Sequence, residues 1–288
     1  MAAIKRRFTP GNGKFATPLI PETGPFNVFV TAGLGDWLAI DAFLAPEQRA
    51  RIVRMTLATE YAEPIAALVR AGGYACEIRQ HVEDWKIRGC YIGIEQYLKE
   101  NPTSRLAEPD DVDLSIARVF PRCSRGEFKY AGSSLVNPLA SLDEFDLPPE
   151  YAVIVPRSKN KGRKGRDFND DDWKAAIAAC EAVDLPMVCV YDGEDFSLPS
   201  SQIIDIRNRT SPWQAAEVVK RAYAYLGIDT CWAVLAAKFV HPERFYVRAS
   251  FMALKVYRCV YYAPAFDDVV ISATLRRALE RRPLVRNP

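Results

Sequence analysis

An apolar run passes into a polar turn and then into a helix of small residues in Tyr225-Leu226-Gly227-Ile228-Asp229-Thr230-Cys231-Trp232-Ala233-Val234-Leu235-Ala236-Ala237. Asp229 or Thr230 is placed to cap this helix, because a short side-chain oxygen accepts a hydrogen bond from the free N–H groups of a first helical turn. Those N–H groups, together with the helix dipole, also favour a bound phosphate. The stretch therefore predicts a strand, a turn and a helix that form a phosphate-binding site.

A second turn of this kind lies near the N-terminus, in Val28-Phe29-Val30-Thr31-Ala32-Gly33-Leu34-Gly35-Asp36. Two such turns favour an enzyme that binds a nucleotide in one domain and a second substrate in the other. The chain has 288 residues, which exceeds the usual size of a single hydrophobic core, so we expect two domains.

Short β-rich runs alternate with helical patterns along the whole chain. This alternation predicts an α/β fold of parallel sheets flanked by helices. In the first half we expect strands at 27–31, 51–57, 74–78 and 112–119, and helices at 36–44, 63–71 and 85–99. In the second half we expect strands at 151–155, 186–191, 203–206, 223–228, 245–247 and 256–262, and helices at 170–183, 212–222 and 269–282.

Composition shifts divide the chain into four parts. Residues 1–25 form a basic arm rich in proline and glycine, and 26–145 form the N-terminal domain. A polar, proline-marked stretch at 138–149 is the expected boundary. Residues 150–265 form the C-terminal domain, and 266–288 form a terminal helix, for which we consider packing back on the N-terminal domain.

The composition is that of an ordinary folded protein, with 49% hydrophobic and 26% charged residues and a net charge of +2. The seven cysteines are scattered and form no C-x-x-C pair, which favours a reducing compartment and no disulfide framework. Only two histidines are present, and they are far apart in the sequence, so we expect no metal site. Without a signal peptide or a long apolar segment, the expected location is the cytoplasm.

Basic residues concentrate in two places: six lie between Arg157 and Arg166, and five lie between Arg276 and Arg286. Each cluster has two interpretations. The first is a solvated surface, and the second is contact with an anionic partner. For the 157–166 loop, the phosphates of a nucleic acid are one such partner, because a polybasic run with glycines suits salt-dependent phosphate contacts.

Three motifs together resemble the GT-B glycosyltransferases, and specifically the heptosyltransferase-like family 9. The first is Gly33-Leu34-Gly35-Asp36. The second is Val155-Pro156 with its basic loop, Arg166-Asp167-Phe168 and Trp173. The third is Gly227-Ile228-Asp229-Thr230 with Leu235-Ala236-Ala237. The resemblance spans nearly the whole chain and implies two Rossmann-like domains, with the acceptor bound in the first and the nucleotide-sugar donor in the second.

The resemblance implies that Asp36 is the base that deprotonates the acceptor hydroxyl. A carboxylate within hydrogen-bond reach of that hydroxyl can take its proton. Gly33, Leu34 and Gly35 would form the acceptor-side loop. The alternative for Asp36 is a purely structural role in capping its helix.

The resemblance also implies that the basic loop and the Asp229 turn hold the donor diphosphate. The donor-binding residues would be Ser158, Lys159, Lys164, Arg166, Asp229 and Thr230, with the cations stabilising the leaving group. The chain departs from the family pattern at Cys231, where a glycine is usual, and at Val234, where a histidine is expected nearby. These departures put the class of donor in question.

The function that follows is an inverting, metal-independent glycosyl transfer that uses a nucleotide-sugar as co-substrate and no cofactor. The acceptor hydroxyl could belong to a glycan, a lipid-linked saccharide or a modified DNA base. Asp111-Val112-Asp113 has the spelling of a metal-binding motif, but acidic pairs are common in loops. Two alternatives stay open: a sugar-nucleotide epimerase of the same fold, and a non-catalytic protein that binds nucleic acid through its basic loop.

Overall fold

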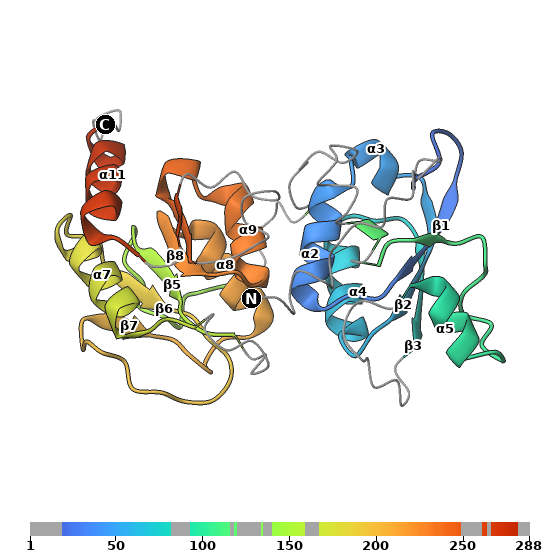
Figure 1. Ribbon diagram of the computed structural model, residues 1–288, viewed down its shortest axis with the longest axis horizontal. Coiled ribbons are helices and arrows are strands. Elements are labelled where there is room, and N and C mark those ends of the chain that lie inside the picture. The colour runs from blue at the N-terminus through green and yellow to red at the C-terminus, as the bar shows by residue number, and fades with distance from the viewer. Residues whose placement is uncertain are drawn as a thin grey trace, which may run out of the picture. The chain divides into compact units, whose positions relative to one another are not determined.

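The structure is a computed structural model that describes residues 19–81, 93–115, 118–119, 134, 140–158, 167–248, 261–263 and 266–281. The chain divides into two compact units, Met1–Val136 and Asn137–Pro288. Each unit contains one parallel sheet with helices on both faces, which confirms the predicted α/β class (Figure 1). Most of the predicted arm at 1–25 lies outside the described residues, as do 85–92 and 256–260.

The N-terminal unit has a four-stranded sheet in the order β3-β2-β1-β4. Its strands are β1 (Phe26–Val30), β2 (Ile52–Ala58), β3 (Glu77–His81) and β4 (Val112–Asp113). Its helices are α2 (Leu34–Phe43), α3 (Pro46–Arg49), α4 (Ala62–Ala71) and α5 (Ile94–Glu100). Helices α2 and α4 pack together on one face, and α5 packs with Phe29 of β1 on the other.

Two strands of this unit differ from their predicted bounds. The third begins at Glu77 rather than 74, because Tyr74 is used as an anchor: its hydroxyl donates to the buried Asp41 carboxylate of α2 at 2.6 Å. The strand predicted at 112–119 ends at Asp113, whose carboxylate accepts the N–H of Ser115 at 2.9 Å and that of Ile94 at 3.1 Å. This carboxylate turns the chain and caps α5, so the strand cannot continue.

The C-terminal unit has a six-stranded sheet in the order β10-β9-β8-β5-β6-β7. Its strands are β5 (Ala152–Val155), β6 (Met187–Cys189), β7 (Ile203–Asp205), β8 (Ala224–Ile228), β9 (Phe245–Arg248) and β10 (Tyr261–Ala263). Its helices are α7 (Asp170–Glu181), α8 (Pro212–Arg221), α9 (Cys231–Phe239), the 3-10 turn η1 (Pro242–Arg244) and α11 (Asp268–Glu280). All the strand pairs are parallel.

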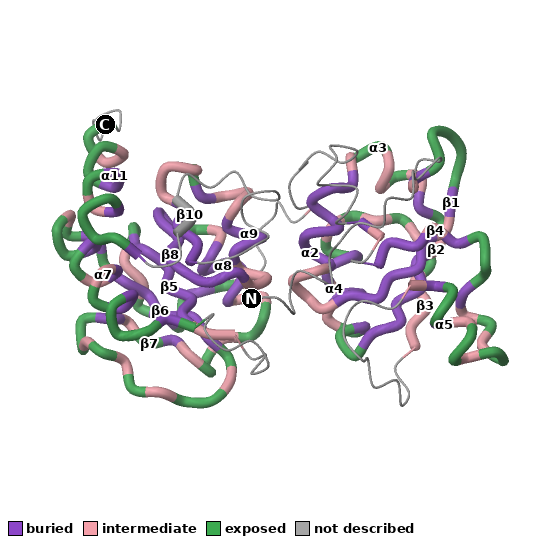
Figure 2. Tube along the Cα trace, viewed as in Figure 1, coloured by how far each residue is buried: buried purple, intermediate pink, exposed green. Residues whose placement is uncertain are grey.

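Burial follows the layers of this unit. One face of the sheet packs with α7 and α11 in a core that includes Ile154, Leu226 and Trp173. The other face carries α8 and α9, which contact each other and the sheet. Strands β5, β6 and β8 are buried throughout and appear purple in Figure 2. Fully buried strands of this kind explain why 151–155 and 223–228 read as continuous apolar runs.

The helix starts follow the capping rules. The side chains of Asn169, Ser211 and Asp267 each accept a backbone N–H at the start of α7, α8 and α11. Ser211 caps the helix expected at 212–222, and Pro212 is its first helical residue, the position that proline favours. Helix α11 packs on α7 and η1 within the C-terminal unit.

Cys180 of α7 and Cys189 of β6 lie in the core as free thiols, and burial raises the pKa of each to about 12. They therefore act as small apolar side chains.

Among the helices in the described part of the chain, none combines the length and the apolar character that crossing a bilayer requires.

Candidate functional site

The strand order of the C-terminal sheet creates a switch point between β5 and β8. From β5 the chain continues through β6 to β7 in one direction, and β8 then restarts on the other side of β5. Val155 at the end of β5 pairs with Gly227 of β8. In open parallel sheets, ligands bind beyond the carboxyl ends of the strands at such a reversal. The turns after Val155 and after Ile228 therefore share one edge of the sheet.

Thr230 is the N-cap of α9, but its side chain makes no capping hydrogen bond. Its Oγ1 is buried and has no hydrogen-bond partner among the described residues. A buried hydroxyl costs free energy unless it is hydrogen-bonded. Asp229, the residue before it, is only 8% exposed. The start of α9 thus presents a hydroxyl and the positive end of a helix dipole, which is a chemical match for a phosphate.

Packing against Tyr225 explains why position 227 is a glycine, and the sequence alone does not reveal this contact. A Cβ added there would lie 2.6 Å from the hydroxyl of Tyr225 and 2.7 Å from its Cζ. The Tyr225 ring lies along the strand, where its hydroxyl donates to the carbonyl of Ile228 at 2.9 Å. Glycine is therefore required for the packing of β8 just before the site.

The loop that follows β5 is closed at its neck by two hydrogen bonds. The N–H of Phe168 donates to the carbonyl of Pro156 at 2.9 Å, and the N–H of Ser158 donates to Oδ1 of Asp167 at 3.3 Å. Ser158 is therefore held at the edge of the sheet near the end of β5. Lys159, Lys164 and Arg166 lie outside the described residues.

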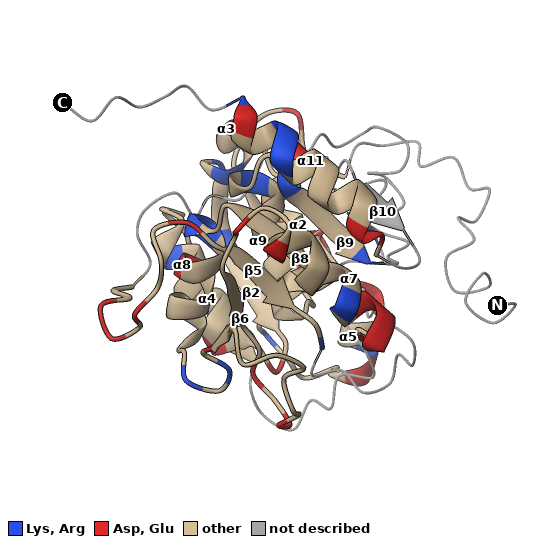
Figure 3. Cartoon of the chain, turned by 90° about the vertical axis from the view of Figure 1, so that its left-hand side faces the viewer, with Lys and Arg blue, Asp and Glu red and all other residues tan. Residues whose placement is uncertain are grey.

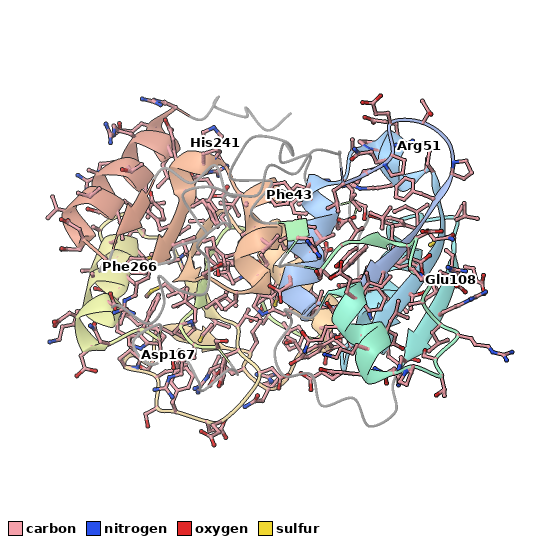
Figure 4. The ribbon with its side chains drawn as sticks, turned by 45° about the vertical axis from the view of Figure 1, so that its right-hand side comes forward. Phe43, Arg51, Glu108, Asp167, His241 and Phe266 are labelled. Carbon is pink, nitrogen blue, oxygen red and sulfur yellow. The ribbon has the colours of Figure 1, made fainter. Side chains whose placement is uncertain are left out.

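A buried ion pair supports this neck. Arg248 at the end of β9 donates to the carbonyl of Asp167 at 2.9 Å, and its Nε lies 2.6 Å from Oδ2 of Asp172 in α7. Asp172 is fully buried and also accepts the N–H of Phe266 at 3.2 Å. Figure 4 labels Asp167 and Phe266 beside α7. Sequence reasoning missed Arg248, because its partners come from distant segments.

The N-terminal sheet has its own switch point, between β1 and β4. Gly33 caps α2 at this edge, and its N–H donates to Oδ2 of Asp36 at 3.2 Å. Gly33, Leu34, Gly35 and Asp36 are all partly exposed. The carboxylate of Asp36 therefore takes the capping role of the alternative interpretation, and it also lies at the edge where a Rossmann-like domain binds its ligand.

The acidic Asp111-Val112-Asp113 motif is used in internal contacts. Asp111 lies 2.6 Å from Arg54 and also accepts the N–H of Glu108. Asp113 caps α5, and one of its oxygens lies 3.6 Å from Arg118. Over the whole described part of the chain, no cluster of three or more histidines, cysteines or carboxylates is arranged to hold a metal ion.

The two positions that depart from the family pattern, 231 and 234, differ in how exposed they are to solvent. Cys231 is the first residue of α9 and is partly exposed. Val234 is only 3% exposed and belongs to the buried side of the helix. The valine side chain is apolar and cannot form a hydrogen bond with a nucleotide-sugar.

No family model matches this chain, and no curated protein matches it either. Among solved structures it is similar to TibC, a dodecameric iron-containing glycosyltransferase from enterotoxigenic E. coli H10407, with 13% identity and a TM-score of 0.49 over 81% of this chain. The match covers only 59% of TibC, so this chain spans less than two thirds of its length.

Two further similarities cover most of both chains. The E. coli heptosyltransferase WaaC with ADP is 11% identical, with a TM-score of 0.45 over 89% of this chain and 97% of WaaC. A glycosyl transferase of family 9 from Veillonella parvula DSM 2008 is 8% identical, with a TM-score of 0.46 over 90% of this chain and 98% of that one. At TM-scores below 0.5, these similarities carry no argument about the activity of this chain.

Proposed function

We propose that this chain is a GT-B glycosyltransferase that moves a sugar from a nucleotide-activated donor to an acceptor hydroxyl, with inversion and without a metal ion. The observation that carries the proposal is the Val155–Gly227 pairing at the switch point of the C-terminal sheet. It brings the neck of the basic loop and the start of α9 to one edge, where a diphosphate would meet both.

In the proposed reaction the oxygen of the acceptor hydroxyl attacks the anomeric carbon of the donor sugar. Its proton passes to the carboxylate of Asp36, and the bond from the anomeric carbon to the phosphate oxygen breaks. The nucleoside diphosphate leaves with the electron pair of that bond. Cations and helix N–H groups around Thr230 and Ser158 stabilise the negative charge that develops on it.

Asp229, Thr230 and Ser158 are the described residues that we assign to the donor, and Lys159, Lys164 and Arg166 complete the assignment from the sequence. The acceptor would bind against Gly33, Leu34 and Gly35. The acceptor could be a glycan or a modified DNA base. A base within a duplex would have to be flipped out to reach the carboxylate.

A thermal-shift panel tests the proposal. The wild-type protein is melted with UDP, ADP, GDP and CDP and with their common sugar conjugates, and the panel is repeated on Arg166→Ala. Arg276→Ala is the matched control, because Arg276 is an exposed arginine of α11 in the same unit. We expect one nucleotide to raise the melting temperature of the wild type and the control but not of Arg166→Ala. If no nucleotide changes the melting temperature of the wild type, the proposal is wrong.

A further inference from the structure

Arg157 follows β5 directly after Pro156, at the edge of the sheet that holds the proposed donor site. Val155 pairs with Gly227, so Arg157 and Asp229 each lie two residues beyond the same paired position. The backbone on both sides of Arg157 is fixed, because Pro156 and Ser158 form the neck of the loop. Arg157 therefore projects from a defined point beside the start of α9.

The guanidinium of Arg157 stacks on an aromatic ring and makes no other directed contact. Its Cζ lies 4.0 Å from the centroid of Phe196. Among the residues that the structure describes, it has no carboxylate within ion-pair distance and no hydrogen-bond partner. Its N–H donors are thus unused, although the side chain is partly buried.

Arg207 offers a comparison within the same site. Its guanidinium also lies over Phe196, with Cζ 4.3 Å from the centroid. Unlike Arg157, it is fully engaged: it binds both carboxylate oxygens of Asp205, at 2.8 and 2.7 Å, and the carbonyl of Phe196 at 2.5 Å. These contacts lower the pKa of Asp205 and account for Arg207 as a structural residue. No such account exists for Arg157.

Phe196 is held firmly enough to fix an arginine. Its ring contacts Tyr191 edge-on, with centroids 5.6 Å apart, and Trp173 of α7 at 6.3 Å. The same loop is bound by Asn208, which donates to the carbonyl of Gly193 at 3.0 Å and accepts its N–H at 2.8 Å. These contacts hold the loop after β6, and with it the Phe196 ring on which Arg157 stacks, in a fixed position.

We propose that Arg157 binds the diphosphate of the donor and that Phe196 positions its guanidinium for this contact. The proposal rests on the proposed function and extends it to two residues outside the donor-binding assignment: Arg157, the first residue of the basic loop, and Phe196, which lies outside the motifs. A planar guanidinium with free donors is suited to two phosphate oxygens at once. Stacking on Phe196 orients the guanidinium before the ligand arrives, which reduces the entropy lost on binding.

A double-mutant cycle on the full chain tests both parts. Binding of UDP, ADP, GDP and CDP, and of each matching nucleoside, is measured by calorimetry for the wild type, Arg157→Gln, Phe196→Leu and the double variant. Arg276→Gln is the control for loss of one positive charge. Unfolding of every variant is followed by circular dichroism. We expect Arg157→Gln to unfold nearly like the wild type, because among the described residues the Arg157 side chain only stacks on Phe196 and makes no ion pair or hydrogen bond.

For the nucleoside diphosphate that binds, we expect Arg157→Gln to raise Kd about 10- to 100-fold, the effect of losing hydrogen bonds to a charged group. Phe196→Leu should raise Kd by a smaller factor, and the double variant should bind no more weakly than Arg157→Gln. The control should bind like the wild type, and the nucleosides should not distinguish the variants.

Four outcomes contradict the proposal. If Arg157→Gln binds the diphosphate like the wild type, Arg157 is not a ligand residue, while the proposed function stands. If the factors by which the two single variants raise Kd multiply in the double variant, Phe196 does not act through Arg157. If nucleoside binding weakens equally, the contact is not with the diphosphate. If the wild type binds none of the four nucleotides, the proposed function fails together with this inference.

Discussion

Asp36 caps a helix at the edge of the sheet where we propose that it also acts as the base. It accepts the N–H of Gly33 through Oδ2 and remains partly exposed at the carboxyl edge of the first sheet. Capping stabilises the start of α2, and the same hydrogen bond fixes the carboxylate near the glycine turn. The capping role that the structure shows is therefore compatible with the proposed role as a base.

Asp36→Asn separates these two roles. The amide oxygen of asparagine can still accept the N–H of Gly33, but the side chain cannot take a proton from a hydroxyl. We expect transfer to fall by about 10²- to 10⁴-fold, the usual contribution of a general base, while nucleotide affinity is unchanged. Glu47→Gln is the control, because Glu47 is an exposed acid in the first turn of α3. Transfer by Asp36→Asn at the wild-type rate would exclude Asp36 as the base.

Gly227→Ala tests the packing of β8. The new methyl group would meet the ring of Tyr225, which is fully buried and cannot move away without displacing Phe245. We expect a loss of about 1–3 kcal/mol in the free energy of unfolding, measured in urea. Tyr225→Phe, which removes only the hydrogen bond to Ile228, should cost about 1 kcal/mol. A Gly227→Ala variant as stable as the wild type would show that the ring is free to move.

Sequence reasoning found the residues whose role is local. Asp229 or Thr230 was expected to cap a helix, and Thr230 is the N-cap of α9. The helix expected from Asp36 begins slightly earlier, with Gly33 as its N-cap. The sequence did not predict the stacking of Arg157 on Phe196, because the two residues come from different loops that are about 40 residues apart in the sequence. Contacts of this kind depend on the strand order, which periodicity does not determine.

At the scale of the elements, the ion pair of Arg248 and Asp172 joins β9 to α7. Both side chains are nearly excluded from solvent, at 9% and 0% exposure. A buried pair gains little net stability over an apolar pair, but a lone buried charge is costly. The pair therefore fixes which segments meet at the neck of the basic loop.

Arg248→Met should lower the free energy of unfolding by about 3–5 kcal/mol, because it leaves the carboxylate of Asp172 buried without its cation. Arg248→Met with Asp172→Asn should recover part of that loss, since the uncompensated charge is gone. Chemical denaturation of the wild type, Arg248→Met, Asp172→Asn and the double variant measures these values. If the double variant loses the sum of the two single effects, the residues do not interact as described.

Element types were easier to predict than element ends. The buried strands β5 and β8 were predicted from continuous apolar runs, and the helices α7 and α8 lie where helices were expected, at 170–183 and 212–222. The third strand and the strand at 112–119 were misplaced, because Tyr74 and Asp113 make side-chain contacts that end regular structure. Basic positions, drawn blue, lie along helix α11 in Figure 3. Two of these arginines are used internally: Arg276 donates to the carbonyl of Ala182, and Arg281 pairs with Glu243.

At the scale of the whole molecule, the account requires that protein cations, and no metal ion, balance the charge of the leaving diphosphate. We therefore expect EDTA to leave both nucleotide binding and sugar transfer unchanged, and added Mg²⁺ to give no increase. In the proposed mechanism, the basic loop that begins at Arg157 supplies the positive charge instead. Loss of transfer in EDTA, restored by Mg²⁺, would contradict metal independence.

The most direct test of the donor site is backbone hydrogen exchange of the full chain with and without the nucleoside diphosphate that binds. The account predicts slower exchange at 157–158 and at 229–233, where the neck of the loop and the start of α9 meet the phosphates. The matching nucleoside, which has no phosphate, should not slow exchange at 229–233. Binding without protection at these positions, or with protection only in the N-terminal unit, would contradict the assignment of the donor site.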